Sequence, residues 1–190
     1  PLHNEKHANT KIKNGINIEF MKTQHLVPVV AHEFARIANE FPMSFVKNNE
    51  TGTFQAVAMF GLEPGENLFI DGDKWTASFA PMASTRYPLG LVKHPDQDQF
   101  GIVIDEASSL VGEEEGNALF ENGEETDYLK RRKEALVSFI EFSQVTDAFT
   151  KFLADKELLV AQTLTVDIKG EKKDINGIYL IDEKKLNELS

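Results

Sequence analysis

The stretch EETDYLKRRKEALVSFIEFSQVTDAFTKFLA, residues 124–154, decides the fold of this chain. Its large apolar residues recur mostly three or four positions apart, which is typical of a helix with one buried face. The stretch Asn122-Gly-Glu-Glu125 resembles a capping box, so the helix is expected to begin near Glu124. Because the stretch is long, polar residues Ser143 to Asp147 could divide it into a pair of helices. The apolar residues are Leu129, Leu136, Phe139, Ile140, Val145, Phe149, Phe152 and Leu153.

Segments typical of β-strands flank this helix on both sides. Leu164 to Lys169 alternates apolar and polar residues, and Ile175 to Ile181 is expected to pair with it as a hairpin. Asp182 can then cap a short final helix. Earlier in the chain, strands are expected over 16–20, 54–60 and 100–104, and a hairpin is expected around Asp71-Gly72-Asp73. A helix is expected over 29–39. The segment from Pro81 to Pro88 is expected to be irregular or a short helical turn.

These segments predict an α+β fold in which a mostly antiparallel sheet packs against the long helix or helix pair. At 190 residues, one domain is the default. We expect residues 1–24 to be a polar N-terminal arm and residues 25–190 to form the single domain.

Composition excludes several classes of function. With 20 Lys and Arg against 31 Asp and Glu, the chain carries a net charge of −11, which opposes nucleic-acid binding. No Cys is present, which excludes disulfides, thiol catalysis and Cys-based metal sites. No apolar run is long enough for an integral membrane segment, and the polar first residues show no signal peptide. We therefore expect a cytoplasmic protein, with the oligomeric state left open.

The sequence resembles the SapC family of bacterial proteins over most of residues 25–189. The matching phrases are HLVPVVAHEFARIANEFPMSF (residues 25–45), Phe60-Gly61-Leu62, Asn67-Leu68-Phe69, Trp75, Arg86-Tyr87-Pro88, Leu119-Phe120 with Asn122-Gly123, and Gly177-Ile178-Tyr179 through Leu189. The resemblance implies an accessory component linked to bacterial surface-layer or peptide export, and with it an association with the cell surface. It supplies no catalytic residues.

The strongest candidate site combines one cation with two aromatic rings. Arg86 is a fixed donor for carboxylate or phosphate groups, and Trp75 and Tyr87 offer flat apolar surface with one polar atom each. Together with Asn67, they could hold a peptide carboxylate or an anionic small molecule. The structural alternative is that Arg86 ties down a loop while both rings fill the core.

Metal and catalytic motifs are weak. His32-Glu33 lacks the second histidine of H-E-x-x-H, and His25 need not share its helix face. The HPDQD stretch, residues 94–98, is better explained as an exposed turn than as a calcium loop. No nucleophile elbow, dinucleotide fingerprint or phosphate loop occurs, so we assign no catalytic residue, no metal and no cofactor.

Two hypotheses therefore remain. The first is a non-enzymatic accessory or binding protein that recognises a peptide, a protein or an anionic ligand. The second is an enzyme of unassigned reaction that acts on peptides or a small carboxylate, with Arg86 as the anchor and His25 or an aspartate as the base.

Overall fold

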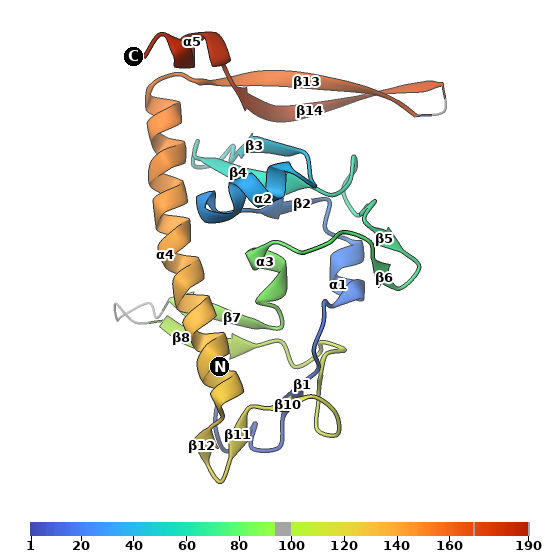
Figure 1. Ribbon diagram of the computed structural model, residues 1–190, viewed down its shortest axis with the longest axis vertical. Helices are drawn as coiled ribbons and strands as arrows, with labels where there is room; N and C mark the ends of the chain where they lie inside the picture. The colour runs from blue at the N-terminus through green and yellow to red at the C-terminus, as the bar shows by residue number, and fades with distance from the viewer. Residues whose placement is uncertain (94–99, 169, 190) are drawn as a thin grey trace.

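A single helix, α4 (Asp127–Asp155), runs along one side of the molecule for most of its length (Figure 1). The computed structural model describes residues 1–93, 100–168 and 170–189. With 29 residues, α4 is about 43 Å long at the usual rise per residue. It continues without interruption through residues 143–147, so the structure contains one long helix and not a pair.

The helix begins three residues later than expected. Asn122 and Gly123 both have positive φ, 53° and 81°, and form the turn of a tight hairpin, β11 (Phe120–Glu121) and β12 (Glu124–Glu125). Thr126 is the true N-cap, because its side chain accepts a hydrogen bond from the Leu129 amide. The predicted capping box is therefore wrong, since an Asn-Gly turn signal prevails there.

A five-stranded antiparallel sheet forms one layer beside the C-terminal half of α4, in the order β13-β14-β3-β4-β2. The last two strands of the chain lie at one edge of this sheet, as the predicted hairpin required. The strands are β2 (Leu26–Pro28), β3 (Met43–Lys47), β4 (Phe54–Met59), β13 (Leu159–Ile168) and β14 (Glu171–Ile181). These elements confirm the α+β fold and its antiparallel sheet.

Short elements complete the chain. The helices are α1 (Ile18–Lys22), the 3-10 turn η1 (Ala31–Glu33), α2 (Phe34–Ala38), α3 (Met82–Thr85) and α5 (Glu183–Asn187), the last capped by Asp182 as predicted. The remaining strands are β1 (Lys11–Ile12), β9 (Val111–Gly112) and β10 (Asn117–Ala118) in one small sheet, the predicted hairpin β5 (Ile70–Asp71) and β6 (Lys74–Trp75), and the pair β7 (Leu89–Lys93) and β8 (Phe100–Ile104).

Two expectations for the first forty residues are wrong. Residues 16–20 were expected to form a strand, but Asn17 accepts a hydrogen bond from the Phe20 amide and starts helix α1. The helix expected over 29–39 is shorter, because Val29 and Val30 remain extended and a 3-10 turn precedes α2. The first 24 residues also contribute Ile12 and Met21 to the buried core.

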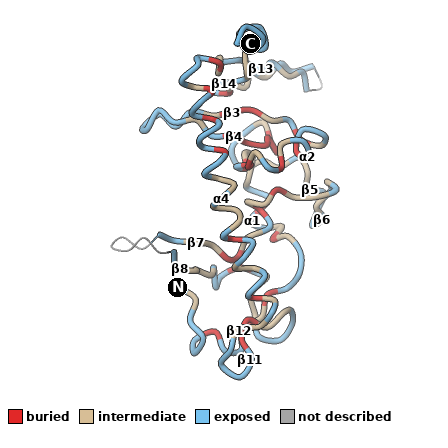
Figure 2. The backbone as a smooth tube through the Cα atoms, turned by 60° about the vertical axis from the view of Figure 1, so that its left-hand side comes forward, coloured by how far each residue is buried: buried red, intermediate tan, exposed pale blue. Residues whose placement is uncertain are grey.

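The apolar interior consists of two clusters, and α4 contributes to both. Leu153 packs in the cluster beneath the main sheet, which includes Ile37, Phe41 and Phe60. Leu129 and Leu136 pack in the other cluster, around Ile12, Leu89, Leu119 and Phe120. Figure 2 shows buried segments spread along the length of the molecule. The helix therefore packs against both cores and joins them.

A buried carboxylate fixes η1 against α3. Glu33 is 9% exposed, and its two oxygens accept hydrogen bonds from the Val30 amide (3.2 Å) and from the Met82 amide (3.0 Å). Burial raises the pKa of the Glu33 carboxyl above its ordinary value, although the two amide bonds oppose that change. Glu33 thus positions the first turn of α3, which leads directly to Arg86.

Replacing Glu33 with alanine should lower stability by about 1–3 kcal/mol, because buried amides would lose their acceptor. The difference in stability between the variant and the wild type should shrink as the pH rises. A carboxyl whose pKa is raised in the folded state contributes its full stability below its unfolded-state pKa, and this contribution is lost as the pH rises through its folded-state pKa. Urea unfolding at several pH values measures both effects. Glu50→Ala, at an exposed turn, is the control. Equal stability of the two variants would contradict this role for Glu33.

Candidate functional site

Helix α3 holds Arg86 and Tyr87 at its C-terminal end. Pro81 precedes the helix, and Arg86 forms its C-cap. The guanidinium of Arg132, on α4, donates to the carbonyl oxygens of Thr85 (3.0 Å) and Arg86 (2.8 Å). Carbonyls at a helix end lack donors within the helix, and Arg132 supplies donors to two of them, although the Arg86 carbonyl also accepts from the Leu89 amide. The backbone of the candidate site is therefore attached to α4.

The side chain of Arg86 has no hydrogen-bond acceptor among the residues that the structure describes. It is half-buried, and its guanidinium carbon lies 4.8 Å from the centre of the Phe139 ring. Its Nε atom is buried without a hydrogen-bond partner, and no ion pair joins Arg86 to any other described residue. Burial lowers the pKa of the guanidinium from its ordinary value, but arginine keeps its charge in proteins. The site therefore contains a cation for which the described part of the chain supplies no ion-pair partner.

Tyr87 stands beside this cation with its hydroxyl engaged. Its ring stacks on Phe20, with centroids 4.4 Å apart and planes 5° apart, and its hydroxyl donates to Asp105 at 2.6 Å. Burial raises the pKa of the Tyr87 hydroxyl, as do the hydrogen bond to Asp105 and the negative charge of that residue. The other oxygen of Asp105 accepts from the Ala107 amide. Tyr87 is thus a neutral donor near neutral pH.

A cavity of 310 Å³ lies between the end of α3 and the pair β7–β8. We call it the Arg86 cavity. Its lining combines one cation and one carboxylate with mostly apolar walls, an arrangement suited to a small anionic ligand that also has apolar groups. The lining residues are Phe20, Ala83, Arg86, Tyr87, Pro88, Leu89, Gly90, Val103, Ile104 and Asp105.

Trp75 and Asn67 lie elsewhere in the molecule. The Trp75 indole donates to the Phe79 carbonyl at 2.9 Å, and its ring packs 5.3 Å from that of Phe60. The Asn67 amide donates to the Met21 carbonyl at 2.8 Å and accepts from the Phe69 amide. Neither residue lines the Arg86 cavity. Of the four predicted site residues, the structure therefore brings together only Arg86 and Tyr87.

Phe20, Asp105 and Phe139 are contacts of the site that the sequence did not place beside Arg86. Phe20 is 66 positions from Arg86, and Phe139 looked like one more residue of the apolar helix face. Asp105 is one of several carboxylates, with Asp71 and Glu106, that could form a catalytic pair, but pairing is invisible in the sequence. No local signal pointed to any of them, because each reaches the site through tertiary packing.

The weaker metal candidates remain apart. His32 stacks on Phe142, with centroids 4.2 Å apart, and both oxygens of Glu33 bind backbone amides. Among residues 1–93, 100–168 and 170–189, no three His, Asp or Glu side chains gather as metal ligands would. The HPDQD stretch lies outside the residues that the structure describes.

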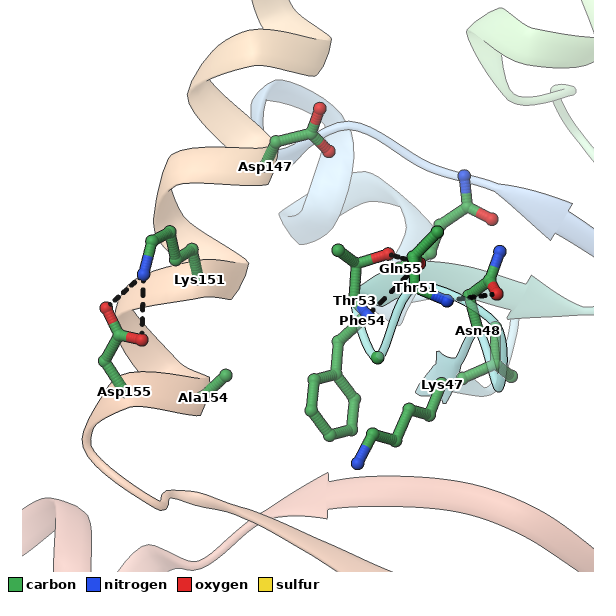
Figure 3. A pocket seen from close by; sticks show the side chains of 12 residues that line it. Lys47, Asn48, Thr51, Thr53, Phe54, Gln55, Asp147, Lys151, Ala154 and Asp155 are labelled. Carbon is green, nitrogen blue, oxygen red and sulfur yellow. Dashed lines mark hydrogen bonds and ion pairs between the residues drawn. The ribbon is translucent and has the colours of Figure 1, made fainter.

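A second and larger hollow, of 760 Å³, lies between α4 and the turn that joins β3 to β4 (Figure 3). Lys151 pairs there with Asp155 on the next turn of α4, and the Asn48 side chain accepts from the Thr51 amide. Lys47 lies 5.3 Å from the centre of the Phe54 ring. Because these polar groups largely engage one another, we regard the Arg86 cavity as the stronger candidate.

Asp105→Asn should lower the pKa of Tyr87, because the variant removes a negative charge and a charged acceptor from its hydroxyl. The pKa should stay above its ordinary value, since burial is the largest cause of the increase. Absorbance titration of tyrosinate at 295 nm measures the change, with Tyr87→Phe to assign the transition. Glu141→Gln, on the exposed face of α4, is the matched control. An unchanged transition in Asp105→Asn would rule out this hydrogen bond.

Within the described residues, no helix combines the length and the apolar character needed to cross a membrane. Neither a curated protein nor a solved structure matches this chain. A family model described as SapC matches residues 2–190, which is essentially the whole chain. Since the match extends over both cores and the Arg86 cavity, the protein belongs to the SapC family.

Proposed function

We propose that this protein is a non-enzymatic binding protein that holds the carboxylate of a peptide at Arg86. In this proposal, the bound peptide belongs to surface-layer or peptide export, for which the protein acts as an accessory component. The observation that carries the proposal is the half-buried guanidinium of Arg86, which lines a cavity and has no acceptor among the described residues.

Energetics favour an anionic ligand for this cation. A hydrogen bond to a charged group contributes about 1.5–3 kcal/mol, whereas a desolvated charge without a partner is costly. A ligand carboxylate would supply an acceptor that residues 1–93, 100–168 and 170–189 do not. The Phe139 ring packs against the Arg86 guanidinium, and a guanidinium can donate two parallel hydrogen bonds to a carboxylate.

The rest of the cavity supports a peptide better than a simple anion. The stacked rings of Phe20 and Tyr87 provide apolar surface for a side chain. Asp105 provides oxygen acceptors for a ligand N–H, and its bonds to Tyr87 and Ala107 hold its carboxylate in position. A chain end with a carboxylate, an amide N–H and a small apolar side chain matches these three features.

An enzyme acting on peptides or a small carboxylate is the second candidate. It is favoured by Asp105 and Tyr87, which share the cavity with Arg86. His25, the other proposed base, does not line the cavity. The raised pKa of Tyr87 makes its hydroxyl a hydrogen-bond donor and a poor nucleophile or base. Binding without chemistry therefore fits the geometry better.

A thermal-shift comparison of two tetrapeptide libraries tests the proposal. One library has free C-terminal carboxylates, and the other has the same sequences with C-terminal amides. Saturation at 100-fold the Kd adds about 2.7 kcal/mol of stability. In a chain of this size, each kcal/mol of added stability raises the Tm by about 2–4 °C. We expect the free acids to raise the Tm and the amides to leave it unchanged.

Variants locate the binding site. Arg86→Met keeps an apolar stem over Phe139 but loses the charge, so it should abolish the shift produced by the free acids. Arg131→Met, on the exposed face of α4, should keep that shift. Equal responses to acids and amides, or a full response in Arg86→Met, would overturn the proposal. Shortened peptides detected by mass spectrometry would favour the enzyme.

A further inference from the structure

Strand β13 leaves one edge of the main sheet open. It pairs with β14 along its whole length, and it is the last strand in the sheet order. Figure 1 shows the β13–β14 hairpin extending beyond β3 and β4, with α5 confined to the end next to α4. Among the described residues, no backbone hydrogen bond reaches the outer edge of β13. An open edge of 10 residues can form hydrogen bonds with another strand.

The strand register shows which backbone groups face outward. The Ala56 carbonyl accepts from the Val29 amide, so the backbone N–H and C=O of Ala56 face away from β3. The backbone groups of its partner Phe45 then face β14. Tyr179 is paired with Phe45, so the backbone groups of Tyr179 face back toward β3. Ala161, paired with Tyr179, must therefore direct its N–H and C=O away from β14, to the outside of the sheet.

The edge lacks the residues that usually protect a strand from pairing. β13 contains no Lys, Arg, Glu or Pro, and Asp167 is its one charged residue. Leu164 and Ile168, on one face of the strand, are 41% and 43% exposed. Exposed apolar side chains beside unpaired backbone groups are typical of a strand that is covered in an assembly.

Charge favours a second copy of this chain as the cover. The chain carries −11, so most of its surface repels another copy. Residues 159–181 contain three acids and three bases and are neutral. An antiparallel pairing of β13 centred on Leu164 places Leu164 against its counterpart and Asp167 opposite Ala161. No like charges meet in that register, and the outward groups of Ala161 gain partners.

We propose that two copies of the chain pair antiparallel along β13 and join their two five-stranded sheets across a two-fold axis near Leu164. The interface is isologous, since the same strand serves both copies. It involves neither the Arg86 cavity nor its peptide, so its test is independent of the proposed function.

Sedimentation velocity of the full chain at micromolar concentration tests this proposal. The expected mass is twice the 21.3 kDa of one chain. Ala161→Pro removes an outward N–H but no bond to β14, and Leu164→Lys places two cations together at the axis. Both variants should sediment as monomers. Ala161→Ser, which keeps the N–H, and Val145→Lys, which adds a lysine at a 62% exposed position on α4, should remain dimers.

Amide hydrogen exchange gives a second measurement in case a variant fails to fold. In the wild type, the Ala161 amide should exchange more slowly as protein concentration rises, whereas an outward amide in a monomer should not respond. A monomer at all concentrations would overturn the proposal. A dimer that persists in both edge variants, or that is lost in Val145→Lys, would also overturn it, because the interface would then lie elsewhere.

Discussion

The packing of one helix against two separate cores is the constraint on which this structure depends. Leu129 and Leu136 near the start of α4 and Leu153 near its end are all almost fully buried, but in different clusters. Polar contacts reinforce the same helix between these ends. The hydroxyl of Thr146 accepts from the Ala31 amide at 2.7 Å, and Arg132 binds the carbonyls at the end of α3. The positions of η1 and of the end of α3 are therefore fixed by bonds to α4.

The parts of the fold that could be predicted are those with local causes. Helical spacing of apolar residues identified α4, the Asp71-Gly72-Asp73 turn identified β5–β6, and Asp182 identified the start of α5. The errors arose where two local signals competed. Glu124 and Glu125 suit a first helical turn, but the Asn-Gly turn before them places both residues in β12. Likewise, the apolar stretch that includes Phe20 forms a helix and not a strand, because an asparagine caps its first turn.

Only part of the candidate site was accessible from the sequence, for a physical reason. Arg86 and Tyr87 are adjacent in the chain, and their types are informative, so they could be found together. Trp75 has the same chemical character as a site residue, yet its indole N–H is bonded to Phe79 and its ring fills the core. Whether an aromatic residue binds a ligand or packs inside depends on its tertiary neighbours. Phe20, Asp105 and Phe139 reach Arg86 only through those neighbours.

The two bonds from Arg132 to the end of α3 connect the cavity mechanically to the long helix. Arg132 holds the backbone of Arg86, and Phe139, about two turns further along the same helix, supports its side chain. An axial slip of α4 by a single residue is about 1.5 Å, enough to separate a donor from an acceptor now 2.8 Å apart. Tension applied where α4 continues into β13 would thus alter the orientation of a cation that lies beside the middle of the helix.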